Sequence, residues 1–405
     1  MPTLAIVGAS LAGAKAAEAA RDTGFEGRVV LIGDEPSAPY ERPPLSKAIL
    51  RGEKNAGSAR VHPDGFYGEH GIELVTDHAI ALDPAARIVS LAGGDTVRFD
   101  TAVLATGAAP RTLDVPGADL GGVHYLRTVD DAVRLRDAIR SGARVAVIGA
   151  GWIGSEVAAS ARQMGASVVL VDPAPVPLQR VLGDEIGGVF RALHADHGVA
   201  LRLGSGIREL RGSKTVEDVV LDDGTVEPAD VVVVGVGVSP RTALAEDAFG
   251  LRVDNGIVVD AHLETNVAGI YAAGDVANAW HPHYRRHMRV EHWSNALNQG
   301  ATAGHNAAGT PAPDTYDRVP YFFSDQYDLG MEYVGHGSPR DSVVVRGELD
   351  TREFIAFWHR DGDVTAAINV NVWDVVDDLK AVVASAKRVD PVRLADPRTA
   401  LADLV

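Results

Sequence analysis

Two short glycine-rich segments carry the residue types and spacing that bind the phosphates of a nucleotide. The first, residues 8–13, follows the apolar run 4–7, and the second, residues 149–154, follows the apolar run 144–148. Glycine permits a tight turn there and a close approach of helix and strand, and the start of the helix offers unpaired N–H groups to a pyrophosphate. Both segments therefore predict binding sites for phosphate-containing ligands.

An acidic residue ends the next apolar run after each glycine turn. Asp34 follows the run 28–33, and Asp172 follows the run 167–171. A carboxylate at this place can accept hydrogen bonds from the ribose hydroxyls of a dinucleotide. Each segment thus matches a dinucleotide-binding βαβ unit, and two such units in one chain are more specific than one, although Ser10 replaces the middle glycine of the first.

The rest of the chain predicts the elements that hold these turns. Alanine-rich or polar helices are expected over 14–20, 155–164 and 295–306, and buried strands over 101–107, 230–234 and 269–275. Residues 71–99 predict a small antiparallel insert, and the chain from Tyr321 predicts strands followed by one helix over about 374–387. The fold class is α/β, with two Rossmann-like dinucleotide-binding domains and a C-terminal α+β domain.

Composition narrows the possible functions. The 405 residues carry a net charge of −17, which argues against non-specific binding to nucleic acid or to an anionic membrane. No apolar run reaches the length of a membrane span and no signal peptide is evident, so a cytoplasmic protein is expected. The absence of cysteine excludes thiol redox chemistry and Cys-ligated metals, so any redox chemistry needs an organic cofactor or a non-thiolate metal.

A proline-rich segment, residues 35–47, follows the first unit. Its four prolines predict a stiff, extended arm rather than a helix. The arm is either a solvated surface loop or a support that presents Arg42 and Lys47 to the nucleotide site, and its position favours the second interpretation.

Five motifs make the chain resemble a known family. They are Glu-Arg-Pro-Pro-Leu-Ser-Lys (41–47), Ala-Thr-Gly (105–107), Gly-Ala-Gly-Trp-Ile-Gly-Ser-Glu (149–156), Tyr-Ala-Ala-Gly-Asp (271–275) and Glu-His-Trp-Ser-Asn-Ala (291–296). Together they resemble the NADH-dependent ferredoxin reductases of the putidaredoxin reductase type, which serve bacterial cytochrome P450s and Rieske oxygenases. These are FAD-containing, glutathione-reductase-like flavoproteins with two dinucleotide-binding folds.

The resemblance implies a domain plan and a set of site residues. It assigns residues 1–110 and 241–320 to an FAD domain, 111–240 to an inserted NADH domain, and 321–405 to the C-terminal domain. The FAD residues would be Gly8, Ser10, Leu11, Ala12, Gly13, Asp34, Glu35, Arg42, Lys47, Ala79, Thr106, Gly107, Arg127, Asp275, Glu291, His292 and Trp293. The NADH residues would be Gly149, Gly151, Ile153, Gly154, Asp172, Arg180 and Gly237. Lys47 and Glu156 match the family's ion pair beside the flavin, and the partner would be an iron–sulfur ferredoxin.

Three alternatives remain at this stage. The chain could act mainly as an NADH-responsive interaction protein. His281, His283 and His287 could bind a metal, but a solvated loop is the favoured interpretation because no matching carboxylates accompany them. Arg285, Arg286 and Arg289 either form a basic docking patch for an acidic ferredoxin or belong to an ordinary solvated loop.

Overall fold

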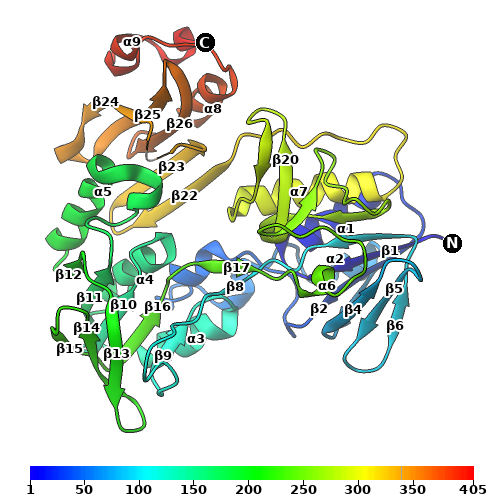
Figure 1. The fold of residues 1–405 in the computed structure, drawn as a ribbon, viewed down its shortest axis with the longest axis horizontal. Coiled ribbons are helices and arrows are strands. Elements are labelled where there is room, and N and C mark those ends of the chain that lie inside the picture. The colour runs from blue at the N-terminus through cyan, green and yellow to red at the C-terminus, as the bar shows by residue number, and fades with distance from the viewer. Residues whose placement is uncertain (339) are drawn as a thin grey trace. The chain divides into compact units, whose positions relative to one another are not determined.

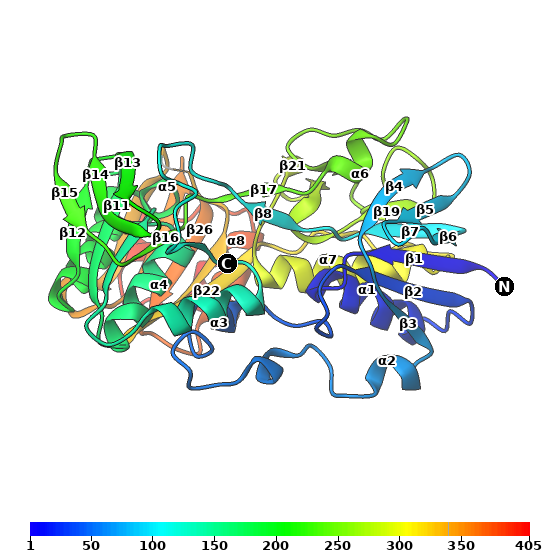
Figure 2. The same cartoon turned by 90° about the horizontal axis from the view of Figure 1, so that it is seen from below.

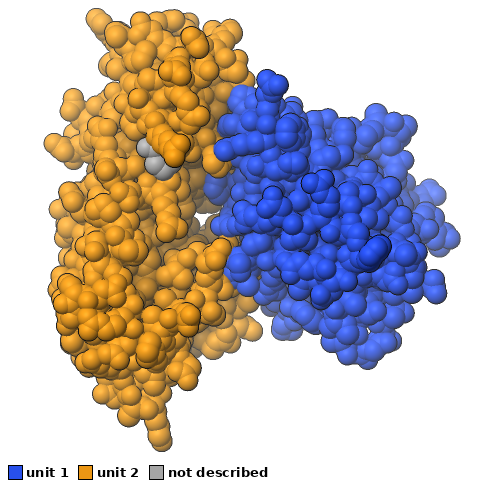
Figure 3. Space-filling model, viewed as in Figure 1, with its two compact units in different colours: residues 1–41, 57–109, 239–320 blue, residues 42–56, 110–238, 321–405 orange. Residues whose placement is uncertain are grey.

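The computed structural model describes residues 1–338 and 340–405 and divides the chain into two compact units. Unit 1 comprises residues 1–41, 57–109 and 239–320, and unit 2 comprises residues 42–56, 110–238 and 321–405 (Figure 3). The short strands β8 (Ala108–Pro110) and β17 (Val238–Pro240) lie where the chain passes from one unit to the other. None of the helices in this description is long and apolar enough to cross a membrane.

Unit 1 is built on a five-stranded parallel sheet with the strand order β19-β7-β1-β2-β3. These strands are β1 (Thr3–Val7), β2 (Arg28–Gly33), β3 (Ile72–Thr76), β7 (Thr101–Leu104) and β19 (Ile270–Ala272). The central strands read as continuous apolar runs because helices cover the sheet. Helices α1 (Leu11–Asp22) and α7 (Trp293–Ala307) lie side by side in this unit (Figures 1 and 2).

The expected antiparallel insert is smaller than the sequence predicts. Strands β4 (Ala79–Asp83), β5 (Ile88–Leu91) and β6 (Thr96–Arg98) form it, whereas β3 pairs in parallel with β2 at the edge of the main sheet. The prediction that all of 71–99 belongs to the insert was therefore wrong. Residues 34–71, which include the short helix α2 (Phe66–Glu69), form the long connection that a parallel pairing of β2 and β3 requires.

A small sheet completes unit 1. It contains β18 (Ile257–Val259), β20 (Ala277–His281) and β21 (Arg286–Met288), with β20 and β21 joined as an antiparallel hairpin. The short helix α6 (Ala243–Glu246) precedes this sheet in sequence.

Unit 2 repeats the parallel-sheet architecture of unit 1. Its parallel sheet has the order β12-β11-β10-β16-β9. The strands are β9 (Val123–Tyr125), β10 (Arg144–Ile148), β11 (Ser167–Asp172), β12 (Ala200–Leu203) and β16 (Val231–Val234). Its helices are α3 (Val129–Ala138), α4 (Trp152–Gln163) and α5 (Gln179–Asp196), and an antiparallel sheet of β13 (Ile207–Gly212), β14 (Val216–Leu221) and β15 (Val226–Pro228) adjoins it.

The C-terminal part of unit 2 is an antiparallel sheet with the order β22-β23-β26-β25-β24. The strands are β22 (Tyr321–Gln326), β23 (Leu329–Gly335), β24 (Ser342–Glu348), β25 (Glu353–Arg360) and β26 (Asp363–Val370). Apolar side chains of α5 share a hydrophobic core with this sheet. The predicted helix over 374–387 is shorter, α8 (Val376–Ala384), because Asp374 and Ala386 have positive φ angles that end it on both sides. A further short helix, α9 (Pro391–Ala395), was not predicted.

Candidate active site

The first glycine turn is closed so tightly that side chains would not fit. Gly8 has a φ of 116°, and a Cβ atom on it would lie 2.0 Å from the carbonyl oxygen of Ala105. A Cβ atom on Gly13 would lie 1.9 Å from the carbonyl oxygen of Gly8. These contacts bring the end of β1, the end of β7 and the start of α1 together.

The N-terminus of α1 is left open to a ligand. Ser10 is the N-cap residue, in an extended conformation, yet its side chain makes no capping hydrogen bond within the described chain, and the first turn has no acidic residue. Helix geometry leaves the N–H groups of Leu11, Ala12 and Gly13 without intrahelical acceptors. By contrast, α3 closes its N-terminus with a capping box of Thr128 and Asp131. The open end of α1 is the kind that receives an anion.

Asp34 lies at the end of β2 in a half-exposed position. Its carboxylate lies 3.6 Å from Nη1 of Arg241 and 3.4 Å from Nδ1 of His78, and 43% of its side-chain surface is exposed. The neighbouring Glu35 accepts a hydrogen bond from the hydroxyl of Tyr40. The carboxylate of Asp34 thus lies near the Arg241 guanidinium and the His78 ring while it stays accessible.

Three further predicted residues of unit 1 are Thr106, Gly107 and Ala79. The hydroxyl of Thr106 donates to the carbonyl of Arg241 (2.7 Å), and the backbone N–H of Arg241 donates to the carbonyl of Gly107 (2.9 Å). These contacts join the Thr-Gly segment after β7 to the segment after β17. Ala79 lies buried at the start of β4, opposite Leu91.

The Gly-Asp segment after β19 continues into the short turn η3 (Gly274–Val276), which contains Asp275. The Arg289 guanidinium donates to the carbonyl of Asp275 (3.2 Å) and forms an ion pair with Glu291 (2.5 Å). His292 is the N-cap residue of α7 and Trp293 is its first residue.

The second glycine turn repeats the geometry of the first. Gly149 has a φ of 99°, and a Cβ atom on it would lie 2.5 Å from the carbonyl oxygen of Gly235. A Cβ atom on Gly154 would lie 1.8 Å from the carbonyl oxygen of Gly149. Gly151, the N-cap of α4, has no described atom within 4 Å of its ideal Cβ position and cannot offer a side-chain cap. The N-terminus of α4 is therefore also open.

Asp172 is fixed beside this second turn. One carboxylate oxygen accepts the N–H of Ala150 and the other accepts the N–H of Ala174, both at 2.7 Å. Ile153 is 46% exposed on the first turn of α4, and Arg180 is exposed on the first turn of α5. Gly237 has a φ of 100°, and its carbonyl accepts the N–H of Arg111 (2.9 Å).

Lys47 and Glu156 form a nearly buried ion pair within unit 2. Nζ of Lys47 lies 2.8 Å from Oε1 of Glu156, with 12% and 4% of the two side chains exposed. Removing one partner of such a pair leaves an uncompensated charge, which is strongly destabilising. Arg42 donates to the carbonyl of Arg127, so these two predicted residues also meet in unit 2.

The proline-rich arm differs from the expected extended conformation. Pro43–Ser46 forms a 3₁₀ turn, η1, with proline at its start. Proline is tolerated there because the first N–H groups of a helical turn need no intrahelical acceptor. Lys47 follows this turn, and its ammonium group is thereby directed to Glu156.

Sequence reasoning missed several residues of this arrangement. Ser46 and Ser324 both donate to the carboxylate of Glu156, and Ser324 is 168 residues away from Glu156 in the chain. Gly300 and Gly304 of α7 pack against the backbone of α1. Their spacing of four residues on a predicted helix was the one available signal for close helix packing.

The histidine and arginine cluster around β20 and β21 also differs from a simple loop. His281 is buried on β20, and Nε2 of His281 lies 3.0 Å from the carbonyl oxygen of Arg318. The interpretation of all three histidines as part of a solvated loop was therefore wrong for His281. No group of three or more His, Asp or Glu side chains within residues 1–338 and 340–405 could hold a metal ion. Arg285 and Arg286 are exposed, whereas Arg289 has only 9% of its side chain exposed.

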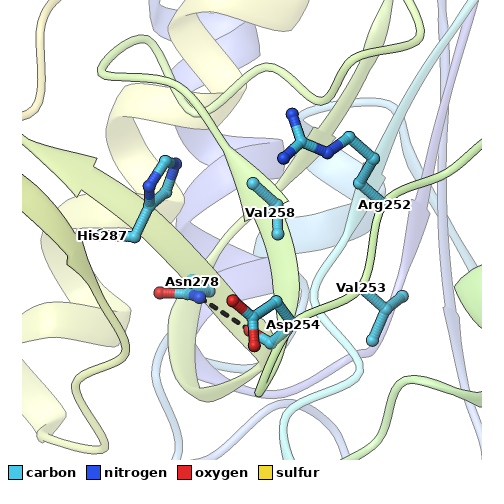
Figure 4. Close-up of a pocket in the computed structure, with 6 residues that line it drawn as sticks. All are labelled: Arg252, Val253, Asp254, Val258, Asn278 and His287. Carbon is cyan, nitrogen blue, oxygen red and sulfur yellow. Dashed lines mark hydrogen bonds between the residues drawn. The ribbon is translucent and has the colours of Figure 1, made fainter.

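A pocket of about 210 Å³ lies beside this cluster in unit 1. Figure 4 shows its lining residues, Arg252, Val253, Asp254, Val258, Asn278 and His287. It contains none of the predicted nucleotide-binding residues. Since its lining mixes Asp254 with Arg252 and His287, its charge does not identify a ligand.

Comparisons with known proteins match the chain along its length. The family model described as pyridine nucleotide-disulphide oxidoreductase matches residues 2–300, and the model described as reductase C-terminal matches residues 321–405. The chain is 40% identical to the ferredoxin–NAD(+) reductase component of the anthranilate 1,2-dioxygenase system of Burkholderia cepacia, covering 98% of this chain and 97% of the relative. It is 35% identical to putidaredoxin reductase of Pseudomonas putida, covering 99% and 96%.

Solved structures of ferredoxin reductases also match the chain along its length. The ferredoxin reductase for the CYP199A2 system from Rhodopseudomonas palustris superimposes with a TM-score of 0.95 at 37% identity, covering 99% of both chains. A chain of the covalent putidaredoxin reductase–putidaredoxin complex superimposes with a TM-score of 0.95 at 34% identity, covering 100% of this chain and 98% of that one. The predicted fold class is thereby confirmed, and the chain belongs to the pyridine nucleotide-disulphide oxidoreductase family, among its ferredoxin reductases.

Proposed function

We propose that this protein passes electrons from NADH through FAD to a small iron–sulfur ferredoxin that serves a cytochrome P450 or a Rieske oxygenase. The observation that carries the proposal is the presence of two glycine turns that lead into uncapped helices, in a chain without cysteine. Two open helix N-termini fit two dinucleotides, one of which would be the organic cofactor that carries the electrons in place of thiols. The relatives named above, which are reductase components of oxygenase systems, support the same function.

The first site fits FAD. The open N–H groups of α1 suit a pyrophosphate, and the accessible carboxylate of Asp34 suits a ribose. We keep the remaining FAD residues that the resemblance implies, including Arg42, Lys47 and Arg127. Glu291 differs in one respect from a free ligand-binding carboxylate, because it is ion-paired with Arg289.

The second site fits NADH. The N–H groups of α4 receive the pyrophosphate, and Asp172 receives the ribose hydroxyls through lone pairs that the backbone does not occupy. The fixed negative charge of Asp172 repels the additional phosphate of NADPH. Ile153 and Gly237 are assigned to the same ligand, and Arg180 is the nearby exposed cation.

The chemistry requires few reacting side chains. FAD, when bound, accepts two electrons as a hydride and returns them singly, as an iron–sulfur acceptor requires. Hydride transfer depends on the orientation of donor and acceptor, and each glycine turn would hold its own ligand in place. Lys47 and Glu156 are assigned to this step, where their charges tune the transfer.

The experiment is a comparison of two acceptors. Purified yellow protein should reduce ferricyanide with NADH, and should reduce cytochrome c only when a ferredoxin is added. An NADH-responsive interaction protein would bind NADH without supporting ferredoxin-dependent turnover, and that result would overturn the proposal.

We also propose that the protein works in the cytoplasm, where metabolism regenerates NADH. Cell fractionation with an antibody against the native protein tests the location. Recovery in the membrane or the exported fraction would contradict it.

A further inference from the structure

The carboxylate of Glu156 receives more donors than an ion pair needs. Nζ of Lys47 and the hydroxyl of Ser324 meet Oε1 at 2.8 and 2.7 Å, and the hydroxyl of Ser46 donates to Oε2. Glu156 lies on α4, Ser46 lies in η1, and Ser324 lies on β22. Three parts of unit 2 therefore converge on one buried carboxylate.

The two hydroxyls act differently from the ammonium group. An ionised carboxylate only accepts hydrogen bonds, so both serines must donate to it while it is charged. Hydrogen bonds to a charged group are among the stronger ones in proteins, and a buried charge without donors is expensive. The serines thus supply two donors to Glu156 that remain when Lys47 moves away or is replaced.

Both serines are held in place by further contacts. Ser46 is 1% exposed, and its carbonyl accepts the hydroxyl of Ser160 from α4 at 2.7 Å. Ser324 is also 1% exposed, and its hydroxyl oxygen lies 3.4 Å from Nε2 of Gln326 on the same strand face. The Gln326 side chain in turn hydrogen-bonds to the buried His194 of α5.

We propose that Ser46 and Ser324 are positioning residues that keep Glu156 ionised and fixed in orientation independently of Lys47. The ammonium group of Lys47 can then change its position or its partner without Glu156 taking up a proton. Because Ser324 lies on β22, the C-terminal sheet then helps to keep the negative charge of Glu156 beside Lys47. The consequence for hydride transfer rests on the proposed function, whereas the ionisation of Glu156 does not.

Arg51 and Asp325 are two further charged residues close to this network. Arg51 lies close to α4 and donates to the hydroxyl of Ser160 (3.3 Å). Asp325 follows Ser324, and burial of its carboxyl raises its pKa, although part of the residue reaches solvent. The charge of Lys47 lowers the pKa of Asp325, whereas the charge of Glu156 raises the pKa of Asp325. His194 faces the network from α5 by way of Gln326, while the parts of β10 and β11 that pack on α4 contribute apolar side chains.

The test is infrared difference spectroscopy of the oxidised holoenzyme across the pH range in which it stays folded. The band of a protonated carboxylic acid is assigned to Glu156 by its loss in Glu156→Gln. Ser46→Ala and Ser324→Ala should each raise the pH at which this band appears, because each removes a donor to the charged form. Ser324→Thr, which keeps the hydroxyl, should behave like the native protein.

Two further variants isolate the role of the serines. In Lys47→Met, Glu156 should remain ionised at neutral pH, and adding both serine substitutions should protonate it there. Ser155→Ala is the matched control, since it removes another buried hydroxyl of α4 that donates to the Ala150 carbonyl and not to Glu156.

Each outcome bears on the proposal. It is overturned if Lys47→Met alone protonates Glu156 at neutral pH, if both serine variants leave the titration unchanged, or if Ser155→Ala shifts it equally. The measurement uses neither NADH nor a ferredoxin. A protein that failed to reduce a ferredoxin but showed the expected titrations would refute the proposed function and leave the role of the serines intact.

Discussion

Asp172 has a single orientation because its two carboxylate oxygens accept two different backbone N–H groups. We expect Asp172→Ser to lose the preference for NADH over NADPH by about 10- to 100-fold in kcat/KM, since one or two hydrogen bonds to a charged group disappear. Steady-state kinetics with both coenzymes measure the ratio. Glu185→Gln, an exposed charge change on α5, is the control and should leave the ratio unaltered.

A native preference for NADPH would remove the assignment of Asp172 altogether. An intermediate result, a loss of NADH efficiency without any gain for NADPH, would mean that Asp172 mainly holds the glycine turn. Its bond to the N–H of Ala150 makes that role measurable, because the variant would then also lose thermal stability.

His194 makes stability depend on pH. Burial lowers its pKa from 6.5 to about 4, against a smaller opposing effect of Gln326. Between these two pH values the unfolded chain binds a proton that the folded protein does not. The contribution of neutral His194 is therefore complete above about pH 6.5 and is lost progressively as the pH falls toward 4.

We expect His194→Gln to reduce this acid sensitivity. At pH 5 the difference in the pH-dependent part of the unfolding free energy should be about 2 kcal/mol relative to pH 7. Chemical denaturation of native protein and variant at both pH values gives the number, with the exposed His287→Gln as the control. Parallel pH profiles for the native protein and His194→Gln would show that other groups dominate the acid response.

At the scale of elements, the contact between α1 and α7 is set by two glycines. A Cβ atom on Gly300 would lie 2.3 Å from the carbonyl oxygen of Ala12, and one on Gly304 would lie 2.0 Å from that of Ala16. Both neighbours are backbone atoms, so the helices must separate to admit a methyl group. We expect Gly304→Ala to destabilise unit 1 by at least about 1–3 kcal/mol and to lower FAD retention, because α1 also carries the first nucleotide turn.

Gly188→Ala is the matched control for this substitution. Gly188 lies within α5, and no described atom lies within 4 Å of its ideal Cβ position. Alanine there should stabilise the protein by about 0.5–1 kcal/mol. Thermal unfolding of both variants, followed by flavin fluorescence, separates the contact from helix propensity. An unchanged melting temperature in Gly304→Ala would mean that α7 shifts without cost.

The sequence predicts elements whose causes are local. The two glycine turns, the helices after them and the strands on either side were predicted correctly. The signals for each unit are its hydrophobic periodicity, its glycine spacing and the acid that ends its second strand, and all three lie within about 30 residues. The prediction for β3 was wrong, because its alternating pattern fits a strand of an antiparallel insert as well as a strand at the edge of a parallel sheet. Its pairing with β2 depends on a long connection that no local pattern reveals.

The same limit explains the candidate site. The pairing of Lys47 with Glu156 came from family resemblance, and the geometry brings them together. Ser324 carries no local signal, because a serine on a strand reads as a neutral residue until its distant partner is known. Arg241 and His78, which lie near Asp34, are missing from the prediction for the same reason.

At the scale of the whole molecule, a net charge of −17 works against an acidic partner. Productive encounter with an acidic ferredoxin needs a local basic surface that outweighs the average field at short range. Arg285 and Arg286, exposed on the hairpin of β20 and β21, remain candidates for such a surface. Arg289 does not, because its side chain is largely buried and neutralised by Glu291.

Reversing the charge of the two arginines separates local from global electrostatics. We expect Arg285→Glu plus Arg286→Glu to raise the KM for ferredoxin about 10-fold and to flatten its salt dependence, while NADH–ferricyanide turnover hardly changes. Arg208→Glu plus Arg211→Glu, at two exposed positions of β13, alters the net charge from −17 to −21 in the same way and is the control. If both double variants weaken the reaction equally, the net field governs docking and the hairpin has no special role. If only the hairpin variant does so, the arginines form the docking surface despite the opposing charge of the rest of the molecule.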